Sequence, residues 1–121
     1  MNAKADFENF VAEQISAFGL ITQKRMFGAL AFYHQGLIIG MAIEDAFYLK
    51  GDALSKSKFD AENLPQFKYG HKTGKQIAMS YWRAPERCLD DPDEMKEWCS
   101  LAYKAALRNQ KPVANRKPKT S

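Results

Sequence analysis

The chain has 121 residues, which is close to the usual size of one domain and leaves no length for a second. Its composition is 45% apolar and 26% charged, with two cysteines, and this excludes disordered, fibrous and disulfide-built proteins. The formal net charge of +4 lies entirely in residues 111–121, which hold four cations and no acid, so residues 1–110 are formally neutral. The sequence therefore does not indicate the domain-wide basic face that is typical of a duplex-binding protein.

The cysteines and the N-terminal segment both favour a cytoplasmic protein. Cys88 and Cys99 belong to no CxxC pair, and a chain of this size can bury an adequate core without disulfides, so both are predicted to be reduced structural thiols. The first twenty residues contain acids within their apolar pattern and predict no signal peptide. No stretch approaches the ~20 apolar residues that a membrane-spanning helix needs, so no membrane association is expected.

The first predicted element is an amphipathic helix over residues 4–18. Its apolar positions recur with the spacing of one helix face, and Gly19 follows at the position where helices commonly end. The residues expected on its buried face are Phe7, Phe10, Val11, Ile15 and Phe18.

A three-stranded antiparallel meander is predicted next, because the apolar period changes from Met26 onward. Residues 37–43 alternate bulky and small side chains, which is typical of a strand with two different faces. Short polar turns separate this strand from residues 29–33 before it and from residues 46–50 after it. Gly36 suits the positive φ that a hairpin turn requires.

A short helix is predicted after the meander. Asp52 can cap it, and the apolar residues Leu54 and Phe59 lie within its expected span of residues 53–62. Pro65 prevents the helix from continuing.

The last helix has the clearest start signal in the chain. Asp91 is the expected cap, Pro92 occupies the first helical position, and Glu94 completes a D-x-x-E box. The helix is expected to run to about Arg108. Its predicted buried stripe comprises Met95, Trp98, Ala102, Ala105 and Ala106.

Two further strands, over residues 67–69 and 76–83 around a turn at 72–75, complete the pattern. The order α-β-β-β-α-β-β-α predicts an α+β fold with two layers, an antiparallel sheet of about five strands and flanking helices. We expect residues 1–110 to form this one domain. Residues 111–121 are expected to be a disordered basic tail, because they have no apolar face to bury.

The motifs support no cofactor, metal or nucleophile site. In residues 70–76 only three residues separate the two glycines, and the segment leads into a strand, which argues against a phosphate loop. His34 and His71 stand beside predicted turns, and no cysteine lies at zinc-ligand spacing from either. Ser80 lies in no nucleophile elbow. No cofactor is therefore predicted.

Polar side chains gather instead where predicted strands end. Tyr48 and Lys50 are two residues apart on one strand, so they point to one face, and Tyr81 and Arg83 do the same on another. Arg25 stands at the start of the first strand. If these strand ends adjoin, the cations and phenols could together recognise a carboxylate or a phosphate on a partner.

The same side chains also have a purely structural interpretation. Arg83 and Lys50 could pair with acids such as Glu86 or Asp52, which would brace the sheet internally. The tyrosines would then pack against the sheet with their hydroxyls in water. The sequence leaves both interpretations open.

Four motifs carry a resemblance to a known family: KRMFGA at 24–29, FYLK at 47–50, MSYWRAP at 79–85, and DDP at 90–92 with Trp98 in the following helix. In their order and spacing they resemble the N-terminal domain of the TfoX (Sxy) competence-regulator family over about residues 8–108. The resemblance implies an α+β domain and a link to transcriptional control of natural competence through contacts with other regulators. It supplies no catalytic residues. Ala29 departs from the second glycine that is common in the family, and the second, helical domain of the larger regulators is absent, so we expect a stand-alone copy.

We therefore expect a cytoplasmic, non-enzymatic regulatory module that binds a protein partner, for example in the transcription machinery. A homodimer formed through an exposed sheet edge is a further expectation. The candidate partner-contact residues are Arg25, Tyr48, Lys50, Tyr81 and Arg83.

Two other functions remain open from the sequence. The first is nucleic-acid binding through the basic tail, against which stands a tail that merely aids solubility. The second is a small enzyme of unidentified reaction that uses the sheet-edge phenols and cations. The tail residues that would contact nucleic acid are Lys111, Arg116, Lys117 and Lys119.

Overall fold

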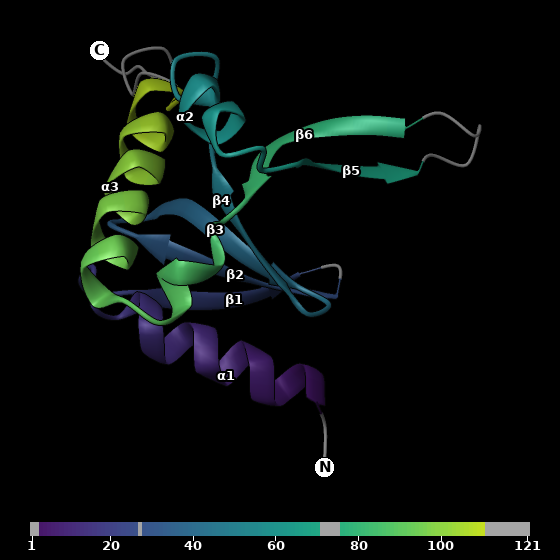
Figure 1. Cartoon of the computed structure of the whole chain (residues 1–121). Coiled ribbons are helices and arrows are strands. Elements are labelled where there is room, and N and C mark those ends of the chain that lie inside the picture. Colours follow the sequence, from purple (N-terminus) through teal and green to yellow (C-terminus); the bar gives the residue numbers. More distant parts are fainter. Residues whose placement is uncertain (1–2, 27, 71–75, 111–121) are drawn as a thin grey trace, which may run out of the picture.

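Six strands form one antiparallel sheet in the spatial order β1-β2-β3-β4-β6-β5 (Figure 1). The computed structural model describes residues 3–26, 28–70 and 76–110. The elements are α1 (Ala3–Ile15), β1 (Thr22–Met26), β2 (Ala29–His34), β3 (Leu37–Ile43), β4 (Ala46–Lys50), α2 (Lys56–Ala61), β5 (Gln66–Gly70), β6 (Gln76–Arg83), the 3-10 helix η1 (Glu86–Leu89) and α3 (Pro92–Arg108). The predicted α+β class, with helices against an antiparallel sheet, is confirmed.

The strand that the sequence analysis missed is β1, at one edge of the sheet. It pairs along its whole length with β2, from Thr22 opposite Tyr33 to Met26 opposite Ala29. Four of its five residues are exposed. A strand that is exposed on both faces has no apolar alternation, so its sequence carries no period-2 signal. The sheet therefore has six strands where about five were expected, and η1 was not predicted either.

The helices build the main core against one face of the sheet. In Figure 1, α3 runs along the sheet and α1 lies below it. At the other end of the core, the Phe59 ring of α2 stacks on Trp82 of β6, with centroids 5.2 Å apart and planes 11° from parallel. Gly51 makes this stacking possible, because a Cβ there would lie 2.6 Å from the Trp82 ring. The largest fully buried side chains are Phe32, Phe59, Ile15, Ile39, Leu49 and Met95.

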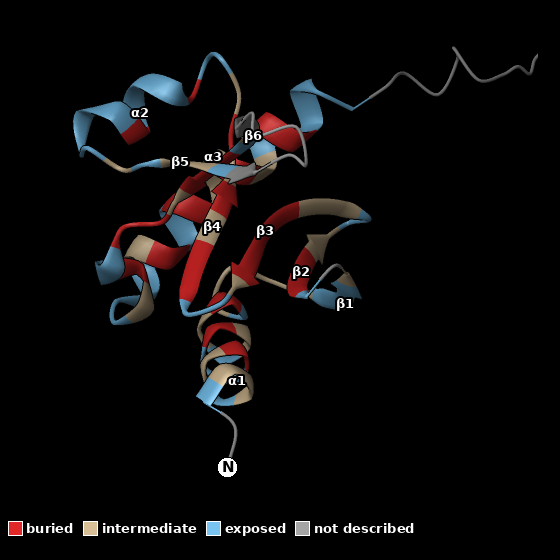
Figure 2. Cartoon of the chain, turned by 90° about the vertical axis from the view of Figure 1, so that its right-hand side faces the viewer, coloured by how far each residue is buried: buried red, intermediate tan, exposed pale blue. Residues whose placement is uncertain are grey.

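None of the described helices covers the opposite face of the sheet, and we call it the open face. Its apolar cluster is formed by side chains of strands alone, with Ala29, Met41 and Tyr81 buried. Figure 2 looks toward this side, and no helix lies in front of β3 and β4. Antiparallel sheets can present one face to water in this way. The partly buried members of the cluster are Ile38, Ile43, Tyr48, Phe67 and Met79.

The predicted start of α3 is confirmed. Pro92 is its first residue, and the Asp91 carboxylate accepts a hydrogen bond of 3.0 Å from the Asp93 amide. The Glu94 carboxylate does not close a reciprocal box. It accepts instead from Arg87 at 2.8 Å and from the Trp98 indole at 3.2 Å, which ties η1 to α3.

Two details of the other helices differ from the prediction. The cap of α2 is Ser55 and not Asp52, so the helix begins three residues later than expected and Leu54 is 72% exposed. On α1, Phe10 is 40% exposed, because the buried stripe is narrower than the apolar pattern and contains Glu8 instead. A charged residue in that stripe gave no apolar signal in the sequence.

Asp52 instead fastens the end of α3 to the loop that follows β4. Its carboxylate accepts two hydrogen bonds of 2.8 Å from Arg108 and one of 3.1 Å from Asn109. It also accepts from the Ser55 amide at 3.0 Å. The Arg108 guanidinium accounts for most of the lowering of the pKa of Asp52.

Replacing Asp52 with Asn should lower the free energy of unfolding by about 1–3 kcal/mol at pH 7, since hydrogen bonds to a charged group contribute on this order. The pKa of Asp52 is lower in the folded chain than in the unfolded chain. This stabilisation is therefore present above the unfolded value of about 4 and is lost as the pH falls toward the folded value. Urea unfolding of both proteins should give a smaller difference at pH 3 than at pH 7.

The matched control is Asp60→Asn, because Asp60 makes only an exposed ion pair with Lys56 on α2. Its effect should stay within about 0.5 kcal/mol. Equal unfolding midpoints for Asp52→Asn and wild type at pH 7 would contradict the role assigned to Asp52.

Candidate functional site

Four of the five candidate contact residues come together on the open face. On the pairing of β4 with β6, Tyr48 lies opposite Arg83 and Lys50 lies opposite Tyr81. Because both pairs belong to one antiparallel ladder and alternate residues share a face, the four side chains form one continuous patch. The expectation that these two strand ends adjoin is therefore met by the sheet. Whether the patch contacts a partner stays a prediction.

Arg25 lies apart from this patch. It pairs with Leu30, whose side chain belongs to the helix-covered core, so Arg25 is on the opposite face of the sheet. Its guanidinium donates hydrogen bonds of 2.7 and 3.1 Å to the two carboxylate oxygens of Glu8 on α1. Glu8 is only 4% exposed, and its hydrogen bond to Arg25 lowers its pKa. Arg25 thus holds α1 against β1.

Tyr81 is the buried centre of the patch. It is 8% exposed, and the Lys50 ammonium lies 5.3 Å from the centroid of its ring. Burial, together with the nearby phenol of Tyr33, raises the pKa of Tyr81 to about 12. The phenol is therefore neutral at physiological pH. A cation above an aromatic face in this arrangement gains a modest attraction and keeps its charge at the surface.

The internal bracing that the sequence also allowed is not found for the cations of the open face. Asp52 is engaged by Arg108, and no ion pair joins Arg83 to Glu86 in the described part of the chain. Within the same residues, neither Lys50 nor Arg83 has a carboxylate within ion-pair distance. Their charges are therefore available to an anionic partner.

Apolar and aromatic side chains surround these cations. The rings of Tyr48 and Phe67 meet edge to face, with centroids 5.1 Å apart and planes at 63°. Both side chains, like Met79, are only partly buried. The patch thus combines accessible aromatic surface with positive charge.

Acidic residues are absent from the strands of the sheet. None of the fourteen Asp and Glu residues lies in a strand. They lie instead in helices, at helix ends and in the connecting segments, for example Glu62 and Glu94 around Arg87. The strands carry the basic residues Lys24, Arg25, Lys50, Lys68 and Arg83. The formal neutrality of residues 1–110 therefore hides strands that carry these five cations and no acid.

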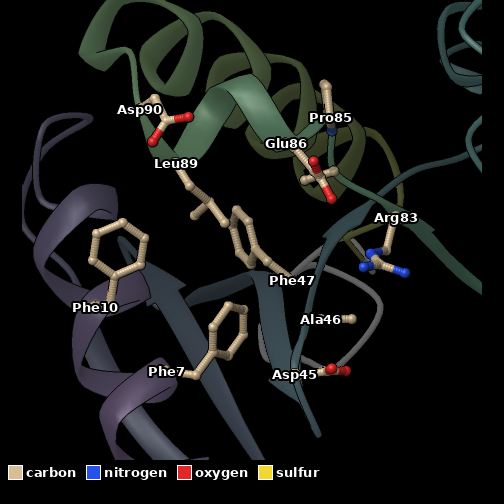
Figure 3. A pocket seen from close by; sticks show the side chains of 11 residues that line it. Phe7, Phe10, Asp45, Ala46, Phe47, Arg83, Pro85, Glu86, Leu89 and Asp90 are labelled. Carbon is tan, nitrogen blue, oxygen red and sulfur yellow. The ribbon is translucent and has the colours of Figure 1, made fainter.

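Two hollows border the helical layer in the described part of the chain. One, of about 250 Å³, lies between α1 and η1, where Phe7, Phe10, Phe47 and Leu89 face one another (Figure 3). Arg83, Asp45 and Glu86 also line this hollow (Figure 3). The second, of about 270 Å³, is lined by α3 and Lys58.

The cysteines and histidines have structural surroundings where the structure describes them. Cys88 and Cys99 are both free and buried, and burial raises the pKa of the Cys88 thiol to about 12 and that of Cys99 as well. Thiols with raised pKa values remain protonated and are poor nucleophiles. The His34 ring packs on Phe18, with centroids 4.7 Å apart, and hydrogen-bonds the Leu20 carbonyl.

Three findings concern other kinds of site. Among the described residues, no group of three His, Cys, Asp or Glu side chains could hold a metal ion. None of the described helices has the length and apolarity to cross a membrane. His71 lies outside the described residues, as do the four tail cations Lys111, Arg116, Lys117 and Lys119.

A comparison with protein-family models matches residues 13–106 to the TfoX N-terminal domain. The matched segment runs from α1 to the last turn of α3 and includes every strand of the sheet. No curated protein matched the chain.

Replacing Arg25 with Ala should destabilise the protein at pH 7, because it leaves the buried Glu8 carboxylate without its cation. We expect a fall of several degrees in the unfolding temperature at pH 7. The fall should shrink below about pH 4, where Glu8 becomes protonated and no longer needs a partner. Thermal unfolding followed by circular dichroism at both pH values measures this.

Lys24→Ala is the control, since Lys24 is the exposed neighbour of Arg25 and has no ion pair among the described residues. Its unfolding temperature should stay close to that of the wild type. If the two variants behave alike at both pH values, Arg25 does not brace α1.

Proposed function

The chain belongs to the TfoX N-terminal domain family, and we propose that it is a non-catalytic regulatory module that binds an anionic macromolecule on the open face. The family supports a competence-regulator-like role in the control of transcription. The observation that carries the proposal is the patch of Tyr48, Lys50, Tyr81 and Arg83, whose cations have no carboxylate partner among the described residues.

Two kinds of observation support a binding role over catalysis. The patch is broad and lies on a sheet face, whereas small-molecule sites are usually concave and enclosed. The buried thiols of Cys88 and Cys99 have raised pKa values and so lack the reactivity of catalytic cysteines. The same free, buried thiols support a reducing compartment such as the cytoplasm.

The position of the patch also fits regulation by contact. Its cations lie on the adjacent strands β4 and β6. The other face of these two strands packs into the main core through Phe47, Leu49 and Trp82. Charged groups on a rigid scaffold lose little conformational freedom when they bind. A partner can therefore be recognised without a rearrangement of the sheet.

In the source organism, deletion of the gene should change the transcript levels of competence genes several-fold. The wild-type gene should restore them, and the double variant Lys50→Ala/Arg83→Ala should not, because it removes two cations of the patch and leaves the core intact. Quantitative transcript measurements together with circular dichroism of the purified variant give the readout.

Lys96→Ala/Lys104→Ala is the charge-matched control, because both lysines are exposed on α3 in the helical layer. It should restore transcription as the wild type does. A folded double variant with full regulatory activity would refute the assignment of the open face, and a deletion without effect on transcripts would refute the regulatory role itself.

A further inference from the structure

The open face carries a third cation, Lys24, on the edge strand β1. Lys24 pairs with Ala31, which shares a face with Ala29 of the open-face cluster, whereas its neighbour Arg25 points into the core side. Lys24, Lys50 and Arg83 therefore stand on β1, β4 and β6 of one face. Lys24 lies three strands from Lys50, and Arg83 lies on the strand beyond; no acid lies in any of these strands.

Partly exposed aromatic rings alternate with these cations. Tyr33 stands on β2, Tyr48 on β4 and Phe67 on β5, and each is partly buried. Tyr33 is on the open face, since it follows Ala31 by two residues and its phenol influences that of Tyr81. With neighbouring strands about 4.8 Å apart, the row of rings and cations extends roughly 20–24 Å across the sheet.

We propose that the open face binds single-stranded nucleic acid that runs across the strands, with bases stacked on Tyr33, Tyr48 and Phe67 and phosphates near Lys24, Lys50 and Arg83. This rests on the proposed function and names the chemistry of its anionic partner. A positive groove or sheet face with interspersed aromatic rings is the combination that single-strand-binding proteins use.

The rings decide between single strands and the other anionic partners. In a duplex the bases are stacked on one another, so ring faces on a sheet have nothing to stack against and only the three cations would contribute. An acidic protein segment would likewise pair with the cations. Its carboxylates, however, would not stack on the rings of Tyr48 and Phe67 or pack against Met79. Unpaired bases use both components of the face.

Fluorescence anisotropy of the full chain with a labelled 15-nucleotide mixed-sequence single strand, as DNA and as RNA, tests the proposal. The triple variant Lys24→Ala/Lys50→Ala/Arg83→Ala should bind more weakly than the wild type. Its slope of log K against log salt should be shallower by about 2.1, because each lost phosphate contact removes ~0.7 from the slope. Comparing variant with wild type cancels any contribution from residues 111–121.

The aromatic component has its own test. Tyr48→Leu keeps apolar packing against Phe67 but removes the stacking surface, and it should weaken single-strand binding at least about fivefold. Phe10→Leu is the matched control, because Phe10 is an exposed ring on α1. Binding by that control should equal that of the wild type.

Two competitors complete the experiment: a duplex of the same sequence and a 15-residue glutamate peptide. Equal affinity for duplex and single strand, with no effect of Tyr48→Leu, would overturn the proposal. Binding of the peptide but of neither strand would also overturn it and leave an acidic protein as the partner. In that outcome the transcript measurements with Lys50→Ala/Arg83→Ala still decide the proposed function independently.

Discussion

The described helices cover only one face of the six-stranded sheet. Because successive side chains of a strand point to opposite faces, each strand residue lies either in the helix-covered core or on the open face. On β4 this alternation sends Phe47 and Leu49 into the core and leaves Tyr48 and Lys50 on the other side. On β6 it buries Trp82 against Phe59 and directs its neighbours to the open face. The candidate site exists because the core is built on the opposite face.

The ion pairs follow from the same division. Arg25 and Arg108 each meet an acid of the helical layer or its margins, and these contacts fasten α1 and α3 in place. Glu62 and Glu94 share Arg87 in the same layer. Four acids, Glu8, Asp52, Glu62 and Glu94, are thus engaged with arginines. The cations of the open face have no such partners among the described residues, which is what a surface for an anionic ligand requires.

Much of this arrangement could be predicted from the sequence, and the exceptions have physical causes. Alternation along residues 37–43 and the Asp91-Pro92 signal identified β3 and the start of α3. The edge strand β1 was not predicted, because exposed strands lack the apolar period that burial imposes. The ion pair of Arg25 with Glu8 was not predicted either. The two residues are seventeen positions apart in the sequence, and Glu8 lies on a helix face that is otherwise apolar. The absence of acids from the strands could not be seen in the net charge of residues 1–110, because it depends on which helices, strands and turns the acids occupy.

The most direct measurement of the central claim is a two-dimensional ¹H–¹⁵N NMR titration of the full chain with an unlabelled single-stranded oligonucleotide. A contact surface on the open face predicts that chemical-shift changes concentrate on β1, β2, β4, β5 and β6, with Lys24, Lys50 and Arg83 among the strongest. Resonances of α1 and of the exposed side of α3 should remain in place. Shift changes confined to residues 111–121, or to the helical layer, would contradict the account.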